Sequence, residues 1–314
     1  MANIESQKIP RRGNVQLTEL SGVIIPMVTP LLAGETIDLE GTRLVVEHLL
    51  EGGVDGLFLL GSTGEFCGLR DKEKDRFLSE VTGVVNGRVA VLAGVSEPGT
   101  ERTLNRIAAA AEAQVDAVVV TPPYYFPLSQ QSVIDHFEYL AEHSPLPIVL
   151  YNIPLTTGVF ITAKTIAQLI SSKAITMVKD SSGDFLHFQD LLSRVAPYDT
   201  CRVFQGHEGL ACASLAMGAD GLVPACGNIA PKLYVSLFEA VRRKRMAEAI
   251  SIQQLVTQLI GIYAYGSVYG AIKVALRDLG LCRDELTRPL AHPSLEEEQE
   301  IRTRVGLVKE KGYL

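Results

Sequence analysis

Short apolar runs recur along this chain of 314 residues, and each is followed by a segment with helical spacing. Eight such runs occur, separated by roughly 25 to 35 residues. Apolar runs that alternate with amphipathic helices indicate parallel strands buried on both faces and joined as βαβ units. The expected strands are 23–27, 56–60, 89–92, 117–120, 148–151, 175–178, 202–204 and 221–223.

Eight units in about 210 residues, without a break that would mark a second domain, favour an α/β fold of the closed (β/α)8 TIM barrel type. An open doubly wound sheet would show a glycine-rich turn after its first strand, where this chain has Val28-Thr29-Pro30. We expect an N-terminal arm at 1–20, the barrel at 21–232 and C-terminal helices packed on the barrel at 233–314. The expected helices between the strands are 39–50, 71–85, 103–113, 130–142, 163–171, 186–195 and 208–217.

Composition excludes several classes of protein. Hydrophobic residues make up 47% and charged residues 21%, which is typical of globular proteins, and the net charge of −7 gives no reason to expect nucleic acid as a partner. No apolar stretch approaches the roughly 18 residues of a membrane span, and residues 1–20 lack the apolar core of a signal peptide. Five cysteines without a CxxC pair and six scattered histidines predict neither disulfides nor a metal site. We therefore expect a cytoplasmic protein with no membrane partner.

Lys179 directly follows the apolar run 175–178, at the carboxyl end of an expected strand. An ammonium group is costly to bury, so this side chain must reach water or lose its proton. A neutral amine at a strand end can attack a carbonyl carbon and form a Schiff base. The alternative is a lysine that leaves the sheet and extends into solvent.

Three further strand ends carry polar groups at the edge where barrel enzymes place their chemistry. Residues 61–65 read Gly-Ser-Thr-Gly-Glu, which is either an ordinary turn or a cradle for a carboxylate or phosphate, with Glu65 as a structural group. The adjacent tyrosines in 121–126 indicate loop packing or a proton relay. Tyr151 ends the strand before that of Lys179, where its phenol could act as a general acid and base or could cap the barrel mouth.

In order and spacing, these segments resemble the pyruvate-dependent class I aldolases of the dihydrodipicolinate synthase and N-acetylneuraminate lyase family. The resemblance rests on segments 61–65 (GSTGE), 124–125 (YY), 151–154 (YNIP), 178–180 (VKD) and 272–276 (IKVAL), and it covers about residues 20–293. It implies a lyase that needs no metal or organic cofactor, and homotetramers built as dimers of dimers.

The resemblance also implies roles for individual residues. Lys179 would form the Schiff base with the keto carbon of pyruvate or another small-molecule 2-oxo acid, and Tyr151 would move protons to and from it. Ser62 and Thr63 would hold the substrate carboxylate. Tyr125 matches the family's second tyrosine, which reaches across a subunit interface in a proton relay.

Departures from the family pattern bear on the substrate. Thr156 stands where dihydrodipicolinate synthases carry an arginine, and a threonine cannot grip a carboxylate in the bidentate manner of a guanidinium. Glu208 is the only acid kept from the acidic pair of N-acetylneuraminate lyases, and Ala225 replaces a serine that they use. We therefore expect reversible cleavage of a 2-keto-3-deoxy sugar acid to pyruvate and an aldehyde. The expected substrate-binding residues are Ser62, Thr63, Gly64, Thr156, Ser181, Gly206, Glu208 and Val223.

Three alternatives stay open at this point. The first two are dihydrodipicolinate synthase activity and dehydration of a 2-keto-3-deoxy acid through the same imine. The third is a catalytically silent sensor of 2-oxo acids, which the presence of Lys179 and Tyr151 disfavours. We expect His207 to be an exposed histidine at a strand end rather than a residue that contacts the substrate.

Overall fold

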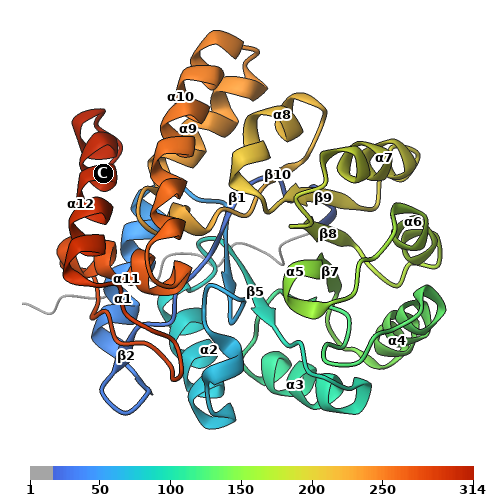
Figure 1. Cartoon of the computed structure of the whole chain (residues 1–314). Helices are drawn as coiled ribbons and strands as arrows, with labels where there is room; N and C mark the ends of the chain where they lie inside the picture. The colour runs from blue at the N-terminus through green and yellow to red at the C-terminus, as the bar shows by residue number, and fades with distance from the viewer. Residues whose placement is uncertain (1–16) are drawn as a thin grey trace, which may run out of the picture.

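The computed structural model describes residues 17–314 and contains a closed barrel of eight parallel strands. The barrel strands are β1 (Gly22–Pro26), β4 (Gly56–Leu59), β5 (Ala90–Gly94), β6 (Ala117–Val120), β7 (Ile148–Asn152), β8 (Met177–Asp180), β9 (Arg202–Gln205) and β10 (Gly221–Leu222). Strand β1 closes the barrel because it pairs with β4 on one side and with β10 on the other. Helices surround the strands as an outer ring (Figure 1). The expected (β/α)8 TIM barrel is confirmed.

The helices of the ring follow the amphipathic segments of the sequence. Several begin at a polar side chain that caps the first turn: Ser129, Thr162 and Asp184 each accept a hydrogen bond from a backbone N–H of the helix that follows. The expected helix at 208–217 is divided into a 3-10 turn, η3 (Glu208–Leu210), and α8. The ring contains α1 (Leu39–Glu51), α2 (Asp71–Val85), α3 (Thr100–Glu112), α4 (Gln130–His143), α6 (Ala163–Ser171), α7 (Phe185–Val195), α8 (Ala211–Ala216) and α9 (Pro231–Arg242).

The core is divided in two by the barrel wall because successive side chains of a strand face opposite sides. Val149 and Met177 lie in the cluster inside the barrel, whereas Leu150 and Val178 lie in the larger cluster between barrel and helices. Leu17, in the 3-10 helix η1 (Leu17–Glu19), also joins the inner cluster. The alternation places Lys179, two residues after Met177, on the inner side of the wall.

Some elements had no signal in the sequence. They are the two-residue strands β2 (Leu31–Leu32) and β3 (Thr36–Ile37), which form a hairpin, and the four-residue helix α5 (Pro154–Thr157). Elements this short show no full hydrophobic period. The expected C-terminal helices are α10 (Met246–Leu259), η5 (Ile260–Ala264), α11 (Val268–Asp278) and α12 (Leu295–Glu310).

The expected division of the chain stays a prediction. Most of the N-terminal arm expected at 1–20 lies outside the described residues, and the boundary expected after residue 232 falls in the first turn of α9. Among residues 17–314, no single helix is long and apolar enough to cross a membrane. The helical segments 246–264 and 268–278 reach that length and apolarity only when they are counted as one, and the chain bends by 111° at the break between them.

Candidate functional site

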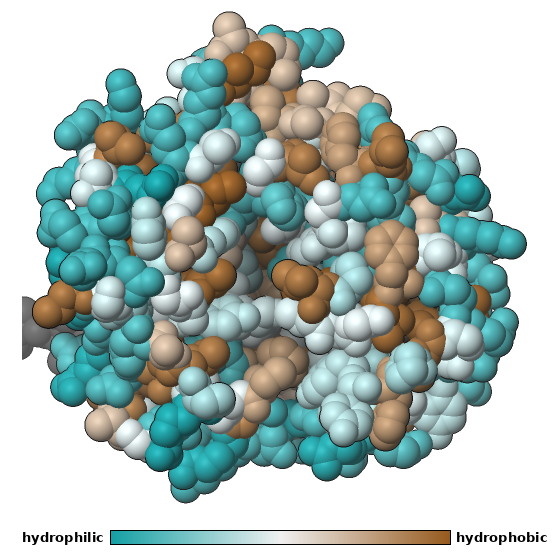
Figure 2. All heavy atoms as spheres, in the orientation of Figure 1, coloured by the Kyte–Doolittle hydropathy of each residue, from teal (hydrophilic) through white to brown (hydrophobic). Residues whose placement is uncertain are grey.

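A cavity of about 340 Å³ opens at the carboxyl ends of the barrel strands. The surface is hollowed near the centre of the face that looks along the barrel (Figure 2). Loops after β4, β5, β6 and β7 form most of its wall, and two C-terminal segments complete it. Hydroxyl groups are frequent in the lining: Ser62, Ser96, Thr121, Tyr124, Tyr151, Thr156, Thr157, Tyr269 and Thr287.

Lys179 and Tyr151 lie side by side beneath this cavity. They are paired in the register between β7 and β8, at the same height, as expected. The lysine Nζ lies 4.0 Å from the centroid of the Tyr151 ring and 4.9 Å from that of Phe58. Lys179 is 5% exposed and does not itself line the cavity, but both of its aromatic neighbours do. The amine therefore lies directly behind the aromatic floor of the cavity.

Gly206 makes room for this lysine. A Cβ at this position would lie 3.0 Å from Lys179 Cε and 2.0 Å from Ser181 Oγ. Gly206, Ser181 and Val223 are not among the residues that line the cavity, and Val223 is part of the core inside the barrel. Their predicted contact with substrate stays a prediction, but the close packing at Gly206 gives this position a steric role beside the amine.

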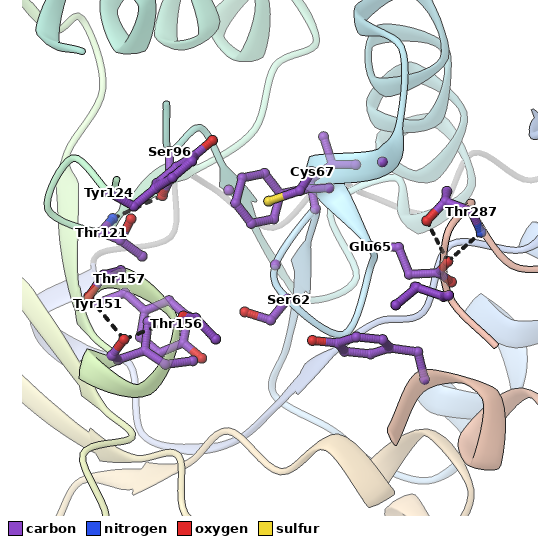
Figure 3. Close-up of a pocket in the computed structure, with 18 of the residues that line it drawn as sticks. Ser62, Glu65, Cys67, Ser96, Thr121, Tyr124, Tyr151, Thr156, Thr157 and Thr287 are labelled. Carbon is purple, nitrogen blue, oxygen red and sulfur yellow. Dashed lines mark hydrogen bonds between the residues drawn. The ribbon is translucent and has the colours of Figure 1, made fainter. Parts of the chain in front are cut away.

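Residues 61–65 form a tight turn at the end of β4. Leu60 and Glu65, on either side of the turn, both have left-handed backbones, with φ of 53° and 56°. Ser62 lines the cavity, opposite Tyr151 and Thr156 in Figure 3. Thr63 and Gly64 do not line it: Thr63 is buried, and the Gly64 carbonyl accepts a hydrogen bond from Thr29 Oγ1 at 2.7 Å. Of the three residues of this turn predicted to bind substrate, the structure brings Ser62 to the cavity.

Glu65 is held by groups far away in sequence. One carboxylate oxygen lies 2.6 Å from Nζ of Lys273 in α11, and both side chains are fully buried. The other oxygen accepts hydrogen bonds from the backbone N–H of Thr287 at 2.8 Å and from its hydroxyl at 3.0 Å (Figure 3). Lys273 also donates to the carbonyl of Glu285 at 2.7 Å. The expected structural role of Glu65 is thus found, although its partners come from the C-terminal region rather than from its own loop.

Thr156 lines the cavity from α5, together with Thr157. The helix α5 ends after one turn at Gly158, whose φ of 69° favours glycine. The position that the family pattern gives to an arginine therefore faces the cavity with an uncharged hydroxyl.

Tyr124, rather than Tyr125, contributes to the cavity wall. Tyr125 is 86% exposed, has a φ of 88° and is not among the lining residues. Tyr124 packs edge to face against Phe66, and burial raises its pKa to about 12. Burial also raises the pKa of the neighbouring Cys67 thiol. The relay role of Tyr125 stays a prediction, and within this chain its side chain does not line the cavity.

Glu208 is not among the residues that line the cavity, and its predicted contact with substrate stays a prediction. Its carboxylate accepts hydrogen bonds from the backbone N–H of Cys226 at 2.9 Å, from the Tyr234 hydroxyl at 2.5 Å and from the Tyr263 hydroxyl. Complete burial raises the pKa of this carboxyl group. Glu208 thus connects the loop after β9 to the C-terminal helices, and His207 beside it is exposed, as favoured from the sequence.

Sequence reasoning missed part of the cavity wall. Ser96 follows β5, so the rule that pointed to the other strand ends would have found it. Its hydroxyl accepts a hydrogen bond at 2.9 Å from the backbone N–H of Thr121, in the segment 121–126 that the sequence already indicated. Tyr269, Thr287 and Arg288 come from the C-terminal region, which has no barrel period to mark them. Within residues 17–314, no group of three or more histidine, cysteine or acidic side chains is arranged to hold a metal ion.

Comparison with known proteins identifies the family. Residues 19–307 match the model of the dihydrodipicolinate synthetase family. The chain belongs to this family. Like its relatives, it is an enzyme of the lyase class.

Three relatives illustrate the similarity. The 4-hydroxy-tetrahydrodipicolinate synthase of Phocaeicola vulgatus is 29% identical over 94% of this chain and 99% of its own length. The probable 2-dehydro-3-deoxy-D-pentonate aldolase YjhH of Escherichia coli K12 is 30% identical over 93% of this chain and 97% of its own length. The structure of YagE, a prophage protein from E. coli K12 solved with pyruvate, superposes with a TM-score of 0.89 at 28% identity, over 94% of this chain and 100% of its own.

The substitution Lys273→Met tests the buried ion pair between Glu65 and α11. We expect it to lower the free energy of unfolding by about 3–5 kcal/mol, because the Glu65 carboxylate loses its counter-charge while still buried. The exposed control Lys72→Met should change it by less than about 0.5 kcal/mol. Denaturant unfolding of both variants measures the difference. Equal stability of the two variants would contradict the importance of the pair, and the double variant E65Q/K273M should recover part of the loss.

Proposed function

We propose that this lyase is a pyruvate-dependent class I aldolase that cleaves a 2-keto-3-deoxy sugar acid to pyruvate and an aldehyde. The observation that carries the proposal is the pairing of Tyr151 with Lys179 beneath a cavity lined by hydroxyl groups. An amine beside a phenol is the pair of groups that imine formation and proton transfer require.

In the proposed reaction, the neutral Lys179 amine attacks the C2 keto carbon and loss of water gives a protonated imine. The leaving water takes the proton of the Tyr151 phenol, which becomes a phenolate. The imine withdraws electrons, so the C3–C4 bond breaks as the C4 hydroxyl gives its proton to this phenolate, which leaves an aldehyde, an enamine and the restored phenol. The enamine takes a proton at C3, and water then releases pyruvate and restores the amine. Ser62, which lines the cavity, would hold the C1 carboxylate and fix C2 against Nζ, which makes the attack effectively intramolecular; the same role for Thr63, which is buried behind the lining, rests on the family resemblance alone. No metal or organic cofactor takes part in this scheme.

The hydroxyl-rich wall supports a polyhydroxylated substrate. Thr156 lines the cavity with an exposed side chain, so its hydroxyl can exchange hydrogen bonds with a sugar hydroxyl, whereas the buried hydroxyls of Thr157 and Thr287 donate to the Ile153 carbonyl and to Glu65. The name of YjhH, a pentonate aldolase, and the pyruvate bound to YagE support the same class of substrate. A second candidate is condensation of pyruvate with aspartate semialdehyde, which the name of the Phocaeicola relative favours and the uncharged Thr156 disfavours.

We further propose that the enzyme acts as a homotetramer, a dimer of dimers, in the cytoplasm. Symmetric assembly is the usual state of soluble oligomers, and the loop after β6 exposes two aromatic side chains, Tyr125 and Phe126, that an interface could cover. Tyr125 would then reach a cavity of the neighbouring copy rather than its own.

The free thiols of all five cysteines fit a reducing compartment.

Borohydride reduction in the presence of pyruvate tests the nucleophile. We expect the wild-type protein to gain the mass of one reduced pyruvate, with the modified peptide carrying Lys179. Lys179→Ala should gain none, whereas the exposed control Lys164→Ala should be modified like the wild type. An adduct on Lys179→Ala would show that another amine is the nucleophile.

Pyruvate release from a panel of 2-keto-3-deoxy acids tests the substrate class. We expect release from at least one sugar acid, and Thr156→Val should lower kcat/KM for it by about two- to tenfold because one hydrogen bond is lost. The exposed control Thr257→Val should leave kcat/KM unchanged. Condensation with aspartate semialdehyde, without release from any sugar acid, would favour the second candidate, and loss of water without an aldehyde product would favour a dehydratase.

A further inference from the structure

A buried polar pair lies on the outer face of β7 and β8, next to Tyr151 and Lys179 along the two strands. Asn152 and Asp180 follow Tyr151 and Lys179, so the strand alternation directs them away from the barrel interior. They are opposite each other in the ladder and are 0% and 1% exposed. Asn152 Nδ2 donates to Asp180 Oδ2 at 2.7 Å. The register between β7 and β8 therefore sets the amine opposite the phenol inside the barrel, and the amide opposite the carboxylate outside it.

The loops that leave these strands complete the hydrogen bonds of the pair. Asp180 Oδ1 accepts from the Ser182 backbone N–H at 3.1 Å and from the Ser182 hydroxyl at 2.7 Å. Asn152 Oδ1 accepts from the backbone N–H of Ile161 at 3.2 Å, three residues beyond Gly158 at the end of α5. The pair thus connects the ends of both strands with the segment that presents Thr156 to the cavity.

His187 of α7 adds a third side chain to the network. Its Nε2 lies 3.4 Å from Asp180 Oδ2 and 3.5 Å from Asn152 Nδ2. The ring is buried and meets Phe160 edge to face at 4.7 Å between centroids. In Figure 1, α7 lies outside β8, and α5 lies beside β7. A helix and a loop therefore hold the outer pair from both sides.

A carboxylate buried to this degree is costly unless its hydrogen bonds are complete, so small displacements of β7 against β8 carry a high penalty. The same displacements would move Lys179 Nζ relative to the Tyr151 phenol, and misplacement by about 1 Å can cost a hundredfold in rate. We propose that Asp180 and Asn152, supported by His187, are positioning residues that hold the Schiff-base lysine and its proton-transfer partner in register. This inference rests on the proposed function.

Exchange of the two residues provides the sharpest test. Asp180→Asn places two amides opposite each other, and Asn152→Asp places two carboxylates there. We expect each single variant to form the pyruvate adduct about ten- to a hundredfold more slowly, with KM within threefold of the wild type. The exchanged variant N152D/D180N keeps one amide and one carboxylate with the same donors and acceptors. We expect it to recover at least tenfold over the single variants.

The readout is the rate of borohydride-trapped pyruvate adduct, measured with the melting temperature of each variant. The control Asp199→Asn makes the same chemical change on an exposed loop and should leave the rate unchanged. Wild-type rates in folded Asp180→Asn, or no recovery in a folded exchanged variant, would overturn the inference. If the single variants do not fold, His187→Gln decides: a rate three- to tenfold lower supports the network, and an unchanged rate refutes it. Absence of an adduct on the wild-type protein would instead refute the proposed function.

Discussion

The buried ion pair between Glu65 and Lys273 joins the two parts of the chain that the site needs. Glu65 ends the turn that brings Ser62 to the cavity, and Lys273 belongs to α11, outside the βα repeat. Neither charge has solvent to stabilise it, so each depends on the other and on the Thr287 and Glu285 backbone. The C-terminal helices are therefore not an appendage of the barrel: they fix one wall of the cavity and the turn that faces the lysine.

The fold could be predicted from the sequence because its signal is repeated. The strand segments, such as 117–120, are short and mostly apolar and are followed by amphipathic helices, and eight repetitions leave few architectures other than a closed barrel. The hairpin β2–β3 and the helix α5 could not be predicted, because two to four residues do not show a period. The packing of α12 on α10 and α11, and the contact of α11 with Glu65, depend on residues far apart in sequence, which no local pattern encodes.

The site residues also divide into those that a local sequence pattern predicts and those that depend on contacts between distant residues. Lys179 and Tyr151 could be predicted because strand polarity alone brings the carboxyl ends of neighbouring strands together. Tyr124 and Tyr125 carry the same side chain, and only the backbone conformation of the loop decides which faces the cavity. The resemblance to N-acetylneuraminate lyases predicts a substrate contact for Glu208, whereas the sequence gives no sign of the two tyrosine hydroxyls that donate to its carboxylate.

These contrasts separate the parts of the molecule that serve chemistry from those that serve specificity. The floor is built into the barrel wall, where Gly206 leaves just enough space for the lysine stem and any larger side chain would displace it. Substitutions in so tightly packed a region would therefore move the Lys179 amine. The rim is formed by loop and C-terminal residues such as Thr156 and Arg288, whose side chains are exposed and free to vary in size and charge. Under the proposed function, one geometry of lysine and tyrosine can serve different aldehydes, because the rim residues that would meet the aldehyde are not those that hold the barrel together.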